Sequence, residues 1–297
     1  MANLRDIRNR ITTVNNTQQI TRAMKMVAAA KLRKAQERMV QTRPYASKIQ
    51  DVVGRLVGSS SDSNPIMRTS EEVENVLMVV VGSDRGLCGG FNNNLFKEVE
   101  KSIESNFLEH KKNGTLSLIT IGKKAGAYFK KRKYNVIESH PGFFDDLQYS
   151  KTSEIMSALT ENFVSEVYDE VFVAFNEFKS VIAQNRRIDK VLPIDPNTIS
   201  ASSDDASNSA NDYIFEPDSE VILEKLLPLH LNIQLWKAVL ESNASEQGAR
   251  MSAMESATEN AKELEQELRL KYNKARQSAI TTEISEIVSG AQALSGD

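Results

Sequence analysis

Glycine and proline are missing from two long stretches at the ends of this chain. Neither residue occurs between Met1 and Arg43, and between Leu229 and Ser289 only Gly248 interrupts. Because glycine and proline are the strongest breakers of helices, their absence predicts terminal helices of about 45 and about 60 residues. Such helices would reach roughly 65 and 90 Å, which exceeds the diameter of a compact globule of this size. We therefore expect both to project and to pack along each other.

Cysteine and long apolar runs are also scarce, and both absences exclude whole classes of protein. The single cysteine, Cys88, excludes an internal disulfide and any multi-cysteine metal site. No run of about 18 apolar residues exists, so we expect no membrane-spanning segment. The start of the chain is charged, and an apolar repeat begins by Leu4, so no cleaved leader is expected. The three histidines, His110, His140 and His230, lie far apart and are not expected to act as ligands or catalysts.

Acidic residues are almost absent from the first predicted helix. Residues 1–43 carry ten Lys and Arg against Asp6 and Glu37, although the whole chain has a formal charge of -3. This basic rod could be a solvated face that pairs with the Glu-rich stretch 255–267, or it could meet an acidic macromolecular partner. Nucleic acid is a third interpretation, which the lack of aromatic residues among these cations weakens.

The amino-terminal stretch has the apolar spacing of a coiled coil. Apolar residues recur at intervals of three and four, first at Leu4, Ile7, Ile11 and Val14 and again, in the same phase, at Ala28, Leu32, Ala35 and Met39. Between these sets the seam positions are polar: Gln18, Thr21 and Lys25. A neighbouring row holds Ile20, Met24 and Val27, which predicts that the apolar stripe rotates in mid-helix.

The carboxy-terminal stretch repeats this spacing in two phases. The upstream set is Met254, Ala257, Ala261, Leu264 and Leu268, and the downstream set is Ile280, Ile284, Ile287, Ala291 and Leu294. The phase changes within the polar interval 273–282, where supercoiling is expected to change locally. Together the two ends predict a long antiparallel coiled coil.

The middle of the chain has a different periodicity. Short apolar runs typical of buried parallel strands alternate with helical segments, which predicts an α/β domain with a largely parallel sheet. The expected strands are 75–81, 116–121, 134–138, 171–178 and 188–194, and the expected helices are 94–107, 123–132 and 153–168. Polar loops are predicted at 58–70 and 195–219. The resulting domains are a helix at 1–57, an α/β domain at 74–195, a polar loop at 196–219 and a helix at 220–297.

Few residues in the α/β region suggest chemistry. The turn SDRGLCGGFN, residues 83–92, follows a strand and precedes a helix, but it lacks the Gly-Lys-Ser/Thr of a P-loop and the spacing of a dinucleotide motif. Cys88 has no histidine near it in sequence to activate it as a nucleophile. The pair Asp145 and Asp146 could serve acid–base catalysis, but an isolated pair in a turn is usually solvated. No catalytic constellation stands out, so the helical rods are expected to carry the function.

Four long motifs give the sequence a family resemblance. They are TQQITRAMKMVAAAKLRKAQ (17–36), SDRGLCGGFN, ASEQGARMSAM (244–254) and YNKARQSAITTEISEIVSG (272–290). In this order they closely resemble the γ subunit of F-type ATP synthases, over essentially the whole chain. The resemblance implies a noncatalytic rotor shaft with a Rossmann-like α/β domain, which couples proton flow to the β-subunit catalytic sites. It implies α, β and ε subunits and the membrane c-subunit ring as partners, no cofactor, no nucleic acid and no direct membrane insertion. The termini suggest a bacterial form, peripheral at the cytoplasmic face of the plasma (inner) membrane.

The resemblance also implies roles for single residues. Polar shaft positions that hydrogen-bond a β-subunit loop correspond to Arg276, Gln277 and Thr281. Met24 and Arg250 correspond to the region beneath an acidic lever segment of the β subunits. Tyr213 and Glu216 resemble foot residues that meet the membrane rotor ring. Two alternatives remain: a coiled-coil adaptor with a structural α/β domain, and a nucleotide-binding enzyme that uses the Gly86–Gly90 turn.

Overall fold

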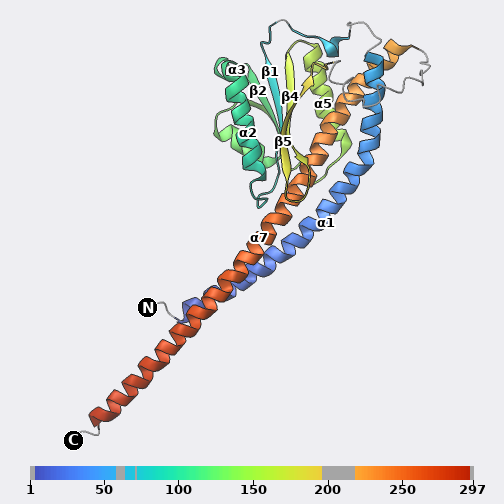
Figure 1. Cartoon of the computed structure of the whole chain (residues 1–297). Helices are drawn as coiled ribbons and strands as arrows, with labels where there is room; N and C mark the ends of the chain where they lie inside the picture. Colours follow the sequence, from blue (N-terminus) through green and yellow to red (C-terminus); the bar gives the residue numbers. More distant parts are fainter. Residues whose placement is uncertain (1–3, 58–63, 71, 196–217, 295–297) are drawn as a thin grey trace. The chain divides into compact units, whose positions relative to one another are not determined.

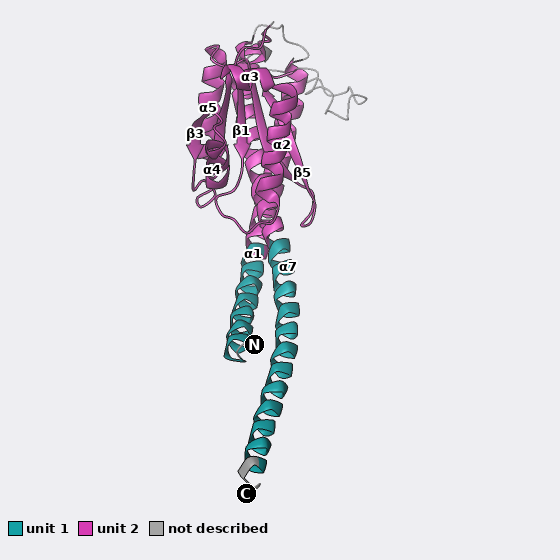
Figure 2. Cartoon of the chain, turned by 90° about the vertical axis from the view of Figure 1, so that its left-hand side faces the viewer, with its two compact units in different colours: residues 1–28, 251–297 teal, residues 29–250 magenta. Residues whose placement is uncertain are grey.

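Two long helices run through both compact units of the chain. The computed structural model describes residues 4–57, 64–70, 72–195 and 218–294 (Figure 1). Unit 1 comprises residues 1–28 and 251–297, and unit 2 comprises residues 29–250 (Figure 2). Helix α1 (Leu4–Val57) and helix α7 (Ser219–Leu294) contribute to each. The prediction of long terminal helices is therefore confirmed.

Both helices continue past a proline. Helix α1 is 54 residues long and contains Pro44, and helix α7 is 76 residues long and contains Pro228. A proline inside a helix removes one backbone hydrogen bond and costs about 3 kcal/mol. Each helix packs on the core of unit 2 near its proline, at Ile49 in α1 and at Leu227 and Leu231 in α7, and this burial offsets the local cost.

A five-stranded sheet forms the middle layer of unit 2, with the order β3-β2-β1-β4-β5 (Figure 1). The strands are β1 (Val76–Val81), β2 (Leu116–Ile121), β3 (Val136–His140), β4 (Glu170–Phe178) and β5 (Gln184–Leu192). Strands β1 to β4 are mutually parallel, which confirms the predicted fold class. Strand β5 pairs antiparallel with β4, because the five residues that join them are too few for a parallel crossover.

Each face of the sheet is covered by helices, as buried parallel strands require. In β1, Leu77, Val79 and Val81 face a core that also contains residues of α1, α7 and α5 (Tyr149–Val164). Met78 and Val80 face the opposite core, built with α2 (Phe91–Asn106) and α4 (Lys123–Lys131). Unit 2 also contains the short α3 (Leu108–Asn113) and the 3-10 helix η1 (Pro65–Met67).

In unit 1 the two helices lie side by side and antiparallel (Figure 2). The Arg8 guanidinium donates to the Tyr272 hydroxyl at 2.7 Å, and the Thr258 hydroxyl donates to that of Thr21 at 2.8 Å. As the residue number rises in α1, the number of its partner in α7 falls. The predicted antiparallel coiled coil is confirmed over this length.

The seam of the coiled coil keeps its phase through its polar section. Thr21 is only 8% exposed, whereas Ile20 and Val27 are 59% and 57% exposed. The predicted rotation of the apolar stripe is therefore wrong. Because Thr21 finds a hydroxyl partner and Lys25 finds Glu255 across the seam, polar residues can occupy it, and the neighbouring apolar row faces outward.

The last part of α7 has no partner in α1. Helix α1 begins at Leu4, close to the level of Tyr272, and Ile280, Ile284 and Ile287 are 47%, 57% and 66% exposed. These residues keep the predicted apolar spacing, but they lie beyond the stretch of α7 that pairs with the described part of α1.

We predict that Gly122→Ala destabilises unit 2 more than Gly114→Ala. Both glycines have positive φ, which costs an alanine about 1–2 kcal/mol. At Gly122 the added Cβ would also lie 2.9 Å from the Ser83 carbonyl carbon, whereas at Gly114 it meets nothing within 4 Å. The crowding should add about 1–3 kcal/mol to the loss at Gly122. Urea unfolding followed by the fluorescence of Trp236, the single tryptophan, measures the free energy of unfolding of both variants. Equal losses of stability would contradict the close approach of Gly122 to Ser83.

Candidate functional site

The carboxylate of Asp84, in the glycine-rich turn at 83–92, binds the loops that follow two neighbouring strands. Asp84 Oδ1 accepts the backbone N–H groups of Lys123 at 2.9 Å and Gly142 at 2.7 Å, and Oδ2 accepts that of Phe144 at 2.9 Å. These donors follow β2 and β3, so one side chain joins the carboxyl ends of three neighbouring strands. The turn thus places a carboxylate where a phosphate loop would present backbone N–H groups to an anion, and this negative charge disfavours a phosphate there. The arrangement therefore favours a structural clasp over a nucleotide site.

Asn92 and Cys88 complete the turn. The Asn92 amide donates to the Ser83 hydroxyl at 2.7 Å and to Cys88 Sγ at 3.3 Å, while its Oδ1 accepts the Ser83 backbone N–H. Cys88 is buried against Phe91 and Ala249. Burial, reinforced by the Glu246 carboxylate, raises the pKa of the Cys88 thiol, which disfavours the nucleophilic thiolate.

Asp145 and Asp146 do not behave as an acid–base pair. Each side chain is 62% exposed, and each has its own cation: Arg85 lies 2.9 Å from Asp145, and Lys151 lies 3.0 Å from Asp146. Hydrogen bonds from Lys151 and Gln148 lower the pKa of Asp146. A carboxyl group with a lowered pKa is a poor general acid near neutral pH.

Helix α7 is anchored to the turn by Arg250, which also forms a buried ion pair on its own helix. Arg250 Nη2 lies 2.6 Å from Glu246 Oε1, and both residues are buried. The same nitrogen donates to the carbonyl oxygens of Arg85 at 3.4 Å and Gly86 at 3.3 Å. Burial raises the pKa of the Glu246 carboxyl, and the charge and hydrogen bond of Arg250 offset part of that effect. Arg250, oriented by Glu246, thus fixes the turn to α7.

Two serines hold α7 against the ends of the central strands. The Ser242 hydroxyl donates to the Val81 carbonyl at 3.3 Å, and the Ser245 hydroxyl donates to the Asn176 carbonyl at 3.0 Å. Together with Arg250, these contacts place successive turns of one face of α7 at the carboxyl end of the sheet.

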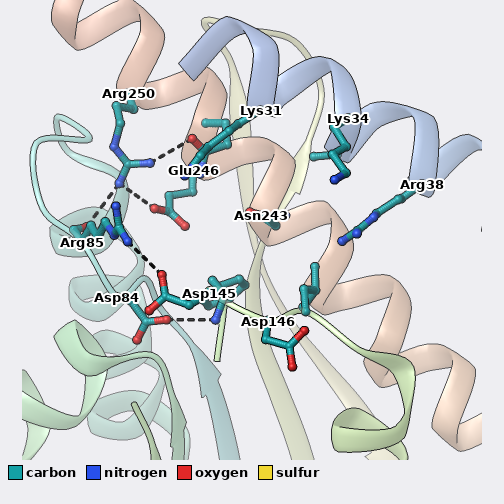
Figure 3. Close-up of a pocket in the computed structure, with 14 residues that line it drawn as sticks. Lys31, Lys34, Arg38, Asp84, Arg85, Asp145, Asp146, Asn243, Glu246 and Arg250 are labelled. Atoms are coloured by element: carbon teal, nitrogen blue, oxygen red, sulfur yellow. Dashed lines mark hydrogen bonds and ion pairs between the residues drawn. The ribbon is translucent and has the colours of Figure 1, made fainter. Parts of the chain in front are cut away.

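A cavity of about 390 Å³ opens beside this anchor, between α1, α7 and the loops after β1 and β3 (Figure 3). Three cations of α1, Lys31, Lys34 and Arg38, line one side. None of the three has an ion pair within the described ranges. The opposite side carries Asp84, Asp145 and Asp146, each of which already has a hydrogen bond or an ion pair within its own surroundings. The cavity therefore offers unpaired positive charge from one helix only.

The residues singled out by the resemblance lie in different surroundings. Arg276, Gln277 and Thr281 are exposed on α7, beyond the stretch that pairs with α1. Met24 is half-buried at the edge of the coiled coil. Arg250 is 9% exposed and is directed into its own chain. Tyr213 and Glu216 lie outside the described residues.

The sequence interpretation missed the clasp and the anchor. Asp84 was one residue of a glycine motif, and nothing in that motif indicates that its carboxylate gathers three strand ends. The i,i+4 spacing of Glu246 and Arg250 could have been noticed on a helix that has many small residues at this point.

None of the helices in the described ranges is apolar over enough residues to cross a membrane.

His230 is buried in unit 2, and this burial lowers its pKa to about 4, so it is neutral at physiological pH.

Comparisons with known proteins agree over nearly the full length. The family model described as ATP synthase matches residues 3–294. The ATP synthase gamma chain of Chloroherpeton thalassium is 46% identical over 300 residues, which cover 99% of each chain. That of Prosthecochloris aestuarii is 48% identical over 297 residues, which cover 100% of each.

Solved structures show the same fold. A chain from the central stalk/c-ring structure of the Tetrahymena thermophila mitochondrial ATP synthase matches with a TM-score of 0.61 and 24% identity, covering 80% of this chain and 99% of that one. A chain from the rotor of the Euglena gracilis mitochondrial ATP synthase matches with a TM-score of 0.64 and 21% identity, covering 93% and 98%.

We predict that Asp84→Asn destabilises unit 2 by about 2–3 kcal/mol, because the substitution removes a charged acceptor and places an amide donor against a backbone N–H. Asp145→Asn is the matched control, since it removes an exposed ion pair worth at most about 1 kcal/mol. Urea unfolding followed by Trp236 fluorescence measures both variants. If the two substitutions lower the free energy of unfolding equally, the hydrogen bonds of Asp84 do not stabilise unit 2 as proposed.

Proposed function

This chain belongs to the ATP synthase gamma-chain family, as its motifs predicted, and we propose that it forms the central rotor shaft of a proton-translocating F-type ATP synthase. The chain itself is noncatalytic. It couples proton flow to conformational changes at the catalytic sites of the β subunits, with the α and β subunits, the ε subunit and the membrane c-subunit ring as its partners.

The observation that carries this proposal is the unpaired stripe at the end of α7. Ile280, Ile284 and Ile287 recur at helical spacing and are 47–66% exposed. A helix with an apolar stripe needs a surface to cover it, because isolated helices are marginal in water. In the proposed assembly, the ring of α and β subunits surrounds this end and supplies that surface.

The coiled coil of unit 1 also has unlike faces. Helix α1 contributes exposed cations, among them Arg10 and Arg22, whereas residues 255–267 of α7 contain five glutamates. Only Lys25 and Glu255 form an ion pair between the two helices in the described residues, at 2.6 Å. A shaft of this kind contacts identical surrounding subunits differently in each orientation.

Unequal contacts are sufficient to couple rotation to catalysis. A surface that binds one conformation of a neighbouring subunit better than another shifts the equilibrium between them by the difference in affinity. Coupling of this kind is reciprocal, so nucleotide binding at the catalytic sites must in turn favour particular shaft orientations.

Specific contacts are assigned by the family motifs. Arg276, Gln277 and Thr281 are proposed to hydrogen-bond a β-subunit loop, which their exposure permits. Met24 and Arg250 are proposed to lie beneath an acidic segment of the β subunits. Arg250 would act there mainly through the turn that it holds, since its guanidinium already donates to Gly86 and Arg85.

The remaining assignments concern the membrane end and the location. Tyr213 and Glu216 are proposed as foot residues at the rotor ring. The protein is proposed to be peripheral at the cytoplasmic face of the bacterial plasma membrane. The alternative of an enzyme that uses the Gly86–Gly90 turn is disfavoured, because the turn lacks the residues of a P-loop and its Asp84 carboxylate is bound to the loops after β2 and β3.

Co-purification tests the proposal directly. The tagged full chain, expressed in its own host, should recover α, β and ε subunits together with c-ring from solubilised membranes. Recovery of unrelated proteins or of nucleic acid, with none of these subunits, would contradict the rotor assignment and favour the coiled-coil adaptor.

A second prediction concerns Met24. In the assembled complex, Met24→Lys should impair proton pumping more than ATP hydrolysis, because a new cation beneath an acidic segment adds an attraction of about 1–2 kcal/mol that each step must break. Ala23→Lys, on the adjacent exposed position, adds the same charge and should have a smaller effect. Both rates are measured in inverted membrane vesicles. Equal coupling in the two variants would count against Met24 facing β.

A further inference from the structure

Unit 2 carries a second concentration of positive charge, far from α1 in sequence. Residues 108–114 and 130–135 contain six Lys and Arg and a single acidic residue, Glu109, in a chain whose formal charge is -3. We call this set the lysine cluster; its members are Lys111, Lys112, Lys130, Lys131, Arg132 and Lys133.

The fold brings the two segments together. Helix α3 ends just before β2, where the Thr115 N–H donates to the His110 carbonyl, and α4 ends just before β3. Lys111 Nζ, from α3, lies 3.1 Å from the Tyr134 hydroxyl and 4.4 Å from the centre of its ring. Two sequence-distant segments thus form one surface.

This surface lies at the amino-terminal edge of the parallel strands, beside α3 (Figure 1). The clasp of Asp84 and the anchor of Arg250 lie at the carboxyl-terminal edge. Six residues of extended strand separate the two edges, or about 20 Å. The lysine cluster is therefore a different surface from the cavity beside the anchor.

Most of the cluster is not neutralised by the protein. Arg132 is held by Glu100 at 3.0 Å and stacks 3.8 Å from the centre of the Tyr128 ring. Lys112, Lys131 and Lys133 are exposed, and none has an ion pair within the described ranges. Lys130 is likewise exposed and has no ion pair within those ranges. These four lysines concentrate positive charge at the ends of α3 and α4, so an anionic surface that approached them would be attracted.

We propose that the lysine cluster binds the headgroups of anionic phospholipids at the membrane surface. The proposal rests in part on the proposed function, which places the chain next to a membrane rotor ring. Binding would be peripheral, through charge alone, and would involve no insertion. It would tether the outer rim of the α/β domain electrostatically to the membrane over which it moves.

The composition of the cluster favours lipid over the other anionic partners. Five of its six members are lysines, which act as mobile point charges, whereas fixed carboxylate or phosphate groups are usually held by bidentate arginines. The one arginine is already occupied by Glu100. Single-stranded nucleic acid also needs exposed aromatic rings for stacking, but Tyr128 and Tyr134 are half-buried and covered by cations. A fluid anionic surface requires only charge density.

The test is co-flotation of the purified full chain with lipid vesicles. Vesicles of phosphatidylcholine containing about one-third phosphatidylglycerol should bind the chain at low salt, and vesicles of phosphatidylcholine alone should not. The variant Lys112→Gln/Lys131→Gln/Lys133→Gln should lower the partition constant roughly a hundredfold, since each lysine near an anionic surface contributes about a factor of five. Binding should also weaken as salt is raised.

Two matched variants separate charge from folding. Lys179→Gln/Lys237→Gln/Lys274→Gln removes the same charge from exposed lysines elsewhere and should bind as the unmodified chain does. Replacing the three cluster lysines by arginine instead of glutamine should preserve binding. Equal binding by the two glutamine variants, equal binding to neutral vesicles, or no binding at all would overturn the proposal.

Competition and co-purification complete the design. If polyglutamate or RNA displaces the chain from the vesicles at equal charge concentration, the cluster is a surface for that polymer and the lipid assignment is wrong. Recovery of α, β and ε subunits with the glutamine variant reports on the rotor assignment separately, so failure of one proposal is distinguishable from failure of the other.

Discussion

Arg250, held by a buried ion pair with Glu246 on the same helix, joins the longest helix to the α/β layer through hydrogen bonds to the turn after β1. Two charged groups taken out of water are stabilised only if their remaining hydrogen-bonding capacity is met, and here the carbonyls of Arg85 and Gly86 meet it. Removing either charge would leave the other buried and unpaired, which makes the junction intolerant of change. Rigidity at this point matters because a shaft transmits torque only if the domain that is driven cannot turn independently of it.

The hydrogen bonds of Asp84 also make the junction between α7 and the α/β layer rigid, by a different interaction. An ionised carboxylate that accepts three backbone N–H groups holds the loops after β1, β2 and β3 in one arrangement. Arg250 therefore binds a turn whose position is already fixed by these hydrogen bonds. The strand-turn-helix unit that looks like a phosphate loop thus supplies a carboxylate that binds backbone N–H groups of two other loops.

The seam of unit 1 shows how polar residues can preserve a helix pair. Thr21 and Lys25 occupy positions that an ordinary coiled coil would fill with apolar residues, and each is matched by a polar partner on α7. A polar layer stabilises less than leucine packing, but it disfavours shifted registers, which would leave these groups unpaired. A defined register fixes which side chains face outward, and the outward row, including Ile20 and Val27, is what surrounding subunits would meet.

The sequence by itself determined the element types, the parallel sheet and the antiparallel helix pair, because these follow from local periodicity and from the absence of helix breakers. It also carried the family motifs. Only the tertiary structure decided which seam residues meet: the periodicity placed Thr21 at the seam, but it could not show that this polar position would be buried while the apolar Ile20 beside it is exposed. It likewise decided that Asp84 gathers three strand ends and that Lys111 meets Tyr134, since both contacts join residues distant in sequence whose side chains carry no local signal of their partners.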